Sequence, residues 1–173
     1  MDQRHKYNLI KYSVYCLITA LASLLQNVGG LFPEIYGARA FLLIPVCICL
    51  TMDEDEKGAA LIGLAGGLFW DLTSLDQMGF NAIYIMTACF ICSSLVTYFI
   101  RKNFFTTIVC AVFFTMLHIF IYWLLFVVIK GTQNAQTSIF YFYIPCGIYT
   151  CALTPLIYFA LRPLKRKFRK MQP

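Results

Sequence analysis

The chain has 173 residues, of which 60% are hydrophobic and only 13% are charged, and its mean hydropathy is +0.72. Soluble domains carry charge on about a quarter of their residues, so this composition excludes an ordinary soluble enzyme and predicts a polytopic membrane protein. The length suits a single membrane domain, residues 1–173, with about six spans of ~20 residues and no added soluble domain. The net charge of +6 needs no nucleic-acid partner, because the placement of the basic residues in a membrane protein explains it.

Six apolar segments predict an all-α membrane protein with six transmembrane helices in one bundle. They cover residues 12–29, 38–52, 58–75, 80–100, 104–129 and 139–161. The first follows a basic stretch, as a secretory signal does, but it continues past a possible cleavage site at 20–22, so we expect it to be retained. The second is short and contains Pro45, which allows a kinked, re-entrant or partly buried segment. The last contains Pro145, Gly147 and Pro155, and we expect a broken helix there.

The distribution of Lys and Arg predicts the orientation in the membrane. If the N-terminus is cytoplasmic, twelve of the 14 basic residues lie on the inner side, and only Arg39 and Lys130 lie on the outer side. Cytoplasmic loops carry an excess of Lys and Arg, so both termini are expected in the cytoplasm. The basic tail, Arg162 to Lys170, is expected to rest on anionic lipid headgroups.

Asp71 is the most informative single residue, because it is a carboxylate within an apolar segment. Counting back in fours along a helix leads to Gly67, Gly63 and Ala59, so the acid continues a row of residues with almost no side chain. Such rows let helices pack closely in lipid, and an acid inside a membrane is a candidate functional residue. We expect the row to face another helix; the alternative is that Asp71, about one turn from the end of its span, reaches interfacial water.

Three further polar residues are predicted to lie at the same depth as Asp71. Arg39 opens the second span from outside, while Asp76 and Asn81 lie in the connection to the fourth span. A carboxylate and a guanidinium leave water together at lower cost than either does alone, which suggests Arg39 as the partner of Asp71. These four residues are the candidates for a partner-binding or pocket site.

The remaining motifs predict no catalytic residue, metal site or cofactor. The eight cysteines all fall in predicted spans with no His or acid nearby, so we expect neither a metal site nor a disulfide. The run Asp53 to Glu56 is expected to be a solvated helix start, and His118 a hydrogen-bonded packing residue. Signatures of membrane hydrolases and a second intramembrane acid are missing, so binding or assembly is favoured over catalysis.

The stretch GLAGGLFWDL at residues 63–72, followed by GFNA at residues 79–82, resembles the central signature of the MreD family of rod-shape-determining membrane proteins. That family has a glycine-rich helix ending in Asp-Leu, then a short turn with a glycine. Length, span number, short loops and the basic tail are also similar over nearly the whole chain.

The resemblance implies a non-enzymatic subunit of the bacterial cell-shape machinery, the elongasome, in the cytoplasmic membrane. MreD-like proteins pair with an MreC-like single-span protein and help regulate lateral peptidoglycan synthesis by a RodA-like polymerase and its transpeptidase, beside MreB. The family is also similar to the six-helix fold of substrate-binding subunits of energy-coupling-factor transporters. A membrane-embedded small-molecule-binding subunit of such a transporter is therefore the alternative function.

Overall fold

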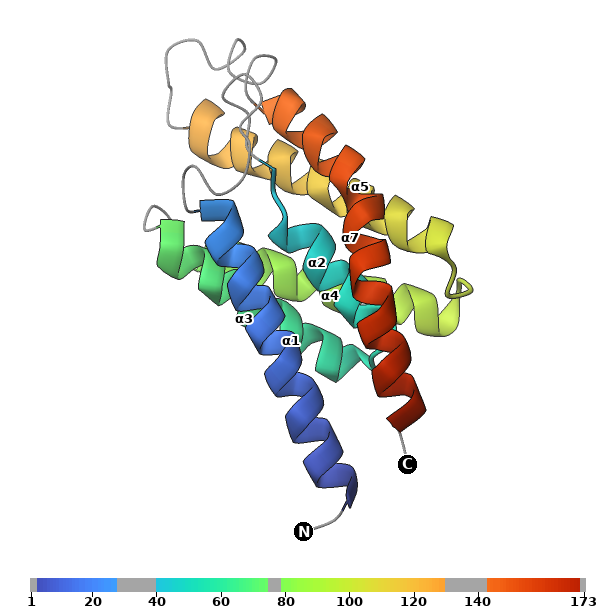
Figure 1. Ribbon diagram of the computed structural model, residues 1–173. Helices are drawn as coiled ribbons and strands as arrows, with labels where there is room; N and C mark the ends of the chain where they lie inside the picture. Colours follow the sequence, from blue (N-terminus) through green and yellow to red (C-terminus); the bar gives the residue numbers. More distant parts are fainter. Residues whose placement is uncertain (1–2, 28–39, 75–78, 130–142, 172–173) are drawn as a thin grey trace.

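The structure is a computed structural model that describes residues 3–27, 40–74, 79–129 and 143–171, and within these ranges it contains helices and no strand (Figure 1). The helices are α1 (Gln3–Asn27), α2 (Leu43–Thr51), α3 (Glu56–Ser74), α4 (Phe80–Tyr98), α5 (Phe104–Tyr122) and α7 (Ile144–Met171). A π-helical stretch, η1 (Trp123–Val128), continues α5 directly. The start of α1 and the end of α7 lie at the same end of the molecule (Figure 1).

Each of the six predicted segments overlaps one of these helices, so the prediction of an all-α fold is confirmed for the residues that the structure describes. Four helical stretches in the described part of the chain are long and apolar enough to cross a membrane. They are Lys6–Asn27, Phe80–Tyr98, Phe104–Val128 and Ile144–Phe168. Six crossings therefore remain a prediction, because α2 and α3 are not among these candidate spans.

Helix α2 is a short buried helix in the middle of the molecule (Figure 1). It has 9 residues, so it is only about 14 Å long, less than half of the ~30 Å hydrocarbon core of a bilayer. Its sequence, LIPVCICLT, is apolar on all sides, and a helix of this kind is stable only where every face is covered. All nine residues are buried, and α2 contacts α1, α3, α4, α5 and α7.

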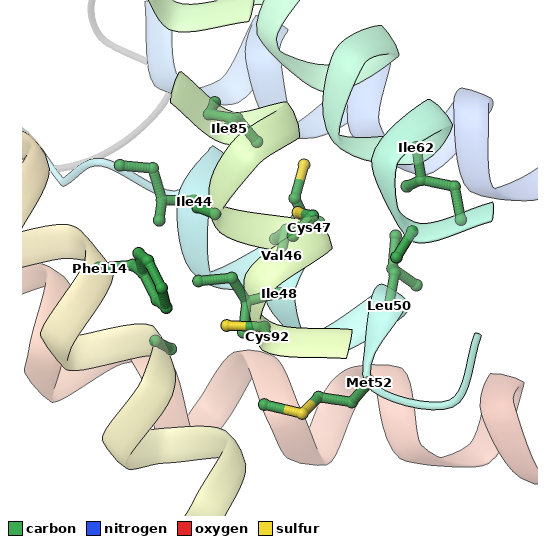
Figure 2. Close-up of a cluster of buried hydrophobic side chains, with 14 of the residues drawn as sticks. Ile44, Val46, Cys47, Ile48, Leu50, Met52, Ile62, Ile85, Cys92 and Phe114 are labelled. Atoms are coloured by element: carbon green, nitrogen blue, oxygen red, sulfur yellow. The ribbon is translucent and has the colours of Figure 1, made fainter. Parts of the chain in front are cut away.

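The core around α2 draws apolar side chains from several helices (Figure 2). Ile44, Cys47 and Ile48 of α2 belong to one cluster with Ile85 of α4 and Phe114 of α5. Among the possibilities left open for the second segment, the structure therefore shows a buried helix.

The two ends of α2 are capped by side chains from other helices. The Leu43 N–H donates to Oε1 of Gln26 in α1 at 3.0 Å, and Nζ of Lys165 in α7 donates to the Cys49 carbonyl at 2.7 Å. Helix termini leave backbone groups without intrahelical partners, and in an apolar environment each such group costs several kcal/mol. Gln26 and Lys165 therefore each satisfy a backbone group at one end of α2.

The row of small residues on α3 lies against the backbone of α4. A methyl carbon added to Gly63 would lie 2.7 Å from the Ile85 carbonyl oxygen, and one added to Gly67 would lie 2.6 Å from the Asn81 carbonyl oxygen. Ala59 is fully buried on the same row. The two helices can approach this closely only because the row carries almost no side chains.

The prediction of a broken last helix is wrong, because α7 is continuous from Ile144 to Met171. Pro145 lies in the first turn, where a backbone N–H has no intrahelical partner to lose. The Thr150 hydroxyl donates to the Cys146 carbonyl at 2.7 Å, and the Thr154 hydroxyl donates to the Thr150 carbonyl at 2.9 Å. The helix continues past Pro155, which removes only the backbone hydrogen bond to the Cys151 carbonyl, and past Pro163.

The prediction of a solvated acidic run at Asp53 to Glu56 is also wrong for part of the run. Glu54 is only 6% exposed, and its carboxylate accepts a hydrogen bond from Lys11 of α1 at 2.7 Å. Asp53 lies 2.7 Å from Nζ of Lys165. The two acids therefore join the α2–α3 connection to the first and last helices. The preference for acids at the start of a helix predicts their position along the chain but not these partners.

Candidate functional site

Asp71 is buried in the last turn of α3, with 2% of its surface exposed, and its carboxylate faces the start of α4. Oδ2 accepts hydrogen bonds from the N–H groups of Gly79, at 2.9 Å, and Ala82, at 3.0 Å. Oδ1 accepts from the backbone N–H of Asn81, at 3.3 Å, and from its side-chain amide, at 2.9 Å. The start of a helix carries unsatisfied N–H groups and partial positive charge, so Asp71 caps α4 from a neighbouring helix.

This cap explains how a carboxylate is accommodated in an apolar segment. Four donors replace the water that the charged group loses on burial. The alternative that Asp71 simply reaches interfacial water does not agree with its burial.

Two glycines place α4 within reach of the carboxylate. Gly79, the residue before α4, has φ = +98°, a conformation that favours glycine. Gly67 lies one helical turn before Asp71 and brings α3 against the first turn of α4. One glycine before Asp71 and one after it therefore bring the start of α4 to the carboxylate.

Asn81 connects the carboxylate to His118 of α5. A carboxylate can only accept hydrogen bonds, so the amide Nδ2 of Asn81 points to Asp71 and the amide Oδ1 points to Nε2 of His118, 2.9 Å away. Nε2 of His118 therefore carries the proton in the neutral ring. Asp71, Asn81 and His118, all at most 4% exposed, form a buried polar chain across α3, α4 and α5.

Aromatic rings surround the imidazole at the end of this polar chain. The distances from the His118 ring centroid are 4.9 Å to Tyr84, 5.1 Å to Trp70, 5.7 Å to Phe80, 6.0 Å to Phe41 and 6.1 Å to Tyr122. Nδ1 of His118 is buried and makes no hydrogen bond with the residues that the structure describes. The low polarity of these surroundings strengthens the hydrogen bonds of the chain.

The buried polar chain joins three helices through side-chain hydrogen bonds. Within the described ranges there is no group of three or more His, Cys, Asp and Glu residues that could hold a metal ion. Each carboxylate oxygen of Asp71 already accepts two hydrogen bonds, so the carboxylate is held in place rather than presented to a ligand. The arrangement is suited to fixing the relative positions of α3, α4 and α5.

Two of the predicted site residues, Arg39 and Asp76, lie outside the described residues, so the pairing of Arg39 with Asp71 remains a prediction. His118 was not assigned to this site from the sequence, because 37 positions separate it from Asn81. The available signal was general: a His and an Asn in apolar segments both need polar partners.

The fold and the site together define a multi-pass, all-helical membrane protein whose buried polar residues connect its helices. The chain belongs to the MreD family: the model of the rod shape-determining protein MreD matches residues 7–168. The match confirms the resemblance noted in residues 63–72 and gives the chain a role in the machinery that determines rod shape. Comparisons with curated proteins and with solved structures gave no match, so the similarity to transporter subunits remains a prediction.

Proposed function

We propose that this protein is a non-enzymatic subunit of the bacterial elongation machinery that binds an MreC-like single-span protein in the cytoplasmic membrane. Through that partner it helps regulate lateral peptidoglycan synthesis by a RodA-like polymerase and its transpeptidase, beside MreB. The observation that carries the proposal is the MreD family match over residues 7–168.

The geometry around Asp71 supports a role in assembly rather than catalysis. A general acid or base needs a carboxylate oxygen that can reach a substrate or water. Both oxygens of Asp71 instead accept backbone and amide hydrogen bonds from α4. This use of the acid stabilises a fixed arrangement of helices on which a partner can dock.

Co-purification from native membranes tests the partner. The affinity-tagged chain, solubilised in mild detergent, is expected to retain a single-span protein with a large extracytoplasmic domain. An unrelated tagged multi-pass protein is the control. Cells depleted of their own copy should lose rod shape and recover it when the chain is supplied. Unchanged shape on depletion, or recovery of an ATPase-linked membrane subunit in place of the single-span protein, would overturn the proposal.

The proposed orientation places both termini in the cytoplasm, with the basic tail Arg162 to Lys170 against anionic headgroups. Single cysteines introduced near Glu34 and Gln133 should react with an impermeant thiol reagent in intact cells. Cysteines near Asp55 and Lys167 should react only after the membrane is opened. Labelling near Asp55 in intact cells would reverse the orientation.

A further inference from the structure

A basic cavity of about 260 Å³ lies between the end of α2, the start of α5 and the second half of α7. Four of the residues that line it are cationic: Lys102, Arg162, Lys165 and Arg166. Asp53 is the single acidic residue in the lining. The cavity thus gathers positive charge from two segments that are 60 residues or more apart in the sequence.

Only one of the four cations is neutralised by a neighbouring acid. Asp53 lies 2.7 Å from Lys165, which also donates to the Cys49 carbonyl. Lys102, Arg162 and Arg166 have no acidic partner in the part of the chain that the structure describes. Three positive charges are therefore left to attract an anion.

The lining also matches the hydrogen-bonding needs of a phosphate group. Guanidinium groups bind phosphate oxygens with paired N–H donors, and a lysine ammonium adds a compact charge. Asn103 and Tyr158 in the same lining supply neutral donors, whereas the Thr107 hydroxyl already donates to the Asn103 carbonyl at 3.1 Å.

The position of the cavity points to a lipid as the source of that phosphate. It lies where two candidate spans end, since Phe104–Val128 begins just after Lys102 and Ile144–Phe168 ends within the basic part of α7. The exposed aromatic rings at this end include Phe99 and Phe105, which are 82% and 75% exposed. Tyr98, at the same end, is 73% exposed, and tyrosine gathers at the membrane–water interface, which is the depth of lipid headgroups.

Tyr158 connects the cavity to this apolar surface. Its hydroxyl-bearing ring lines the cavity, and its ring centroid lies 4.9 Å from that of Phe104. A phospholipid can place its phosphate among the cations and its acyl chains over the rings. A free phosphate would leave the rings unused.

We propose that this cavity binds the phosphate of an anionic phospholipid. The inference rests on the headgroup contact proposed above for the basic tail and makes it specific. The lipid is held jointly by α7 and by residues 102–103 before α5, rather than by the tail alone.

The test compares two double variants of the full chain that lose equal charge. Lys102→Gln with Arg166→Gln alters the cavity, and Arg101→Gln with Lys167→Gln alters the adjacent exposed cations that do not line it. Retention of phosphatidylglycerol, with phosphatidylcholine as the reference lipid, is measured by native mass spectrometry of protein released from mixed nanodiscs. The cavity variant should bind phosphatidylglycerol about tenfold more weakly than the control variant, because it loses two direct charged contacts with the phosphate that the control variant keeps.

Three outcomes would overturn the inference. If both variants lose phosphatidylglycerol binding equally, the lipid contacts the basic surface as a whole and not this cavity. That result would still agree with the headgroup contact proposed for the tail. Complete displacement of phosphatidylglycerol by millimolar inorganic phosphate would assign the cavity to free phosphate. Equal retention of phosphatidylcholine would show that charge plays no part. If the cavity double variant does not fold, Arg162→Gln compared with Lys167→Gln gives the same test with one charge.

Discussion

Replacing Gly67 by Ala tests how closely α3 and α4 pack beside the buried polar chain. The added methyl carbon would lie 2.6 Å from the Asn81 carbonyl oxygen and 2.7 Å from the Ala82 nitrogen, with the Ala82 Cα closer still. Ordinary contacts begin at 3.4 Å, so the helices must separate by more than about 0.8 Å at this point. The obstacle is backbone, and no change of side-chain rotamer can relieve it.

The separation should also weaken the cap on α4. Asp71 lies one turn beyond Gly67, and its hydrogen bonds of 2.9 and 3.0 Å to Gly79 and Ala82 would lengthen past about 3.2 Å, the upper end of normal N–H···O distances. Overpacking costs about 1–3 kcal/mol and each weakened bond to a charged group adds to this, whereas the helix propensity of Ala offsets at most ~1 kcal/mol. We expect a net loss of about 2 kcal/mol in the free energy of unfolding.

The native cysteines provide the assay. Cys47, Cys49 and Cys89 are fully buried, so a thiol-reactive dye reports unfolding during a thermal ramp in detergent as a rise above the constant signal of the exposed Cys16. Gly67→Ala should lower the melting temperature by about 5 °C. Gly147→Ala is the matched control, because its methyl meets the ends of side chains that can turn away, Cε of Met116 at 2.9 Å and Cδ1 of Ile119 at 3.0 Å, rather than backbone. A Gly67→Ala protein that melts with or above the parent would refute the close α3–α4 contact.

Three further predictions concern the polar contacts between helices, each measured as a melting temperature in detergent. In a double-mutant cycle, Asp71→Asn and Arg39→Gln should each destabilise the protein, and together should cost less than their sum if the two side chains pair; additive losses would exclude the pair. His118→Phe should lower the free energy of unfolding by about 1–3 kcal/mol, because it leaves Oδ1 of Asn81 without its donor. His118→Gln should recover part of this loss. If the two variants are equally destabilised, the hydrogen bond to Asn81 does not contribute to stability. Lys165→Met keeps the length of the side chain but removes both the cap on α2 and the ion pair with Asp53, and should destabilise by about 1–3 kcal/mol; an unchanged melting temperature would show that both contacts are dispensable.

The sequence alone was sufficient for the class of protein and for one helix face. Sixty per cent hydrophobic residues with few charges require a membrane, and an isolated carboxylate in such a chain requires partners. The spacing of Gly63, Gly67 and Asp71 is a property of any α-helix, so their common face could be predicted without knowing the neighbouring helix.

The tertiary structure alone decided which residues meet. Hydropathy does not separate an inward face from a lipid-facing one, because both are apolar in a membrane protein. For this reason neither the central position of α2 nor its caps by Gln26 and Lys165 follow from the sequence. The link from Asn81 to His118 depends in the same way on α5 lying beside α4. A buried polar atom demands a partner, but only the packing of the helices determines which partner is within reach.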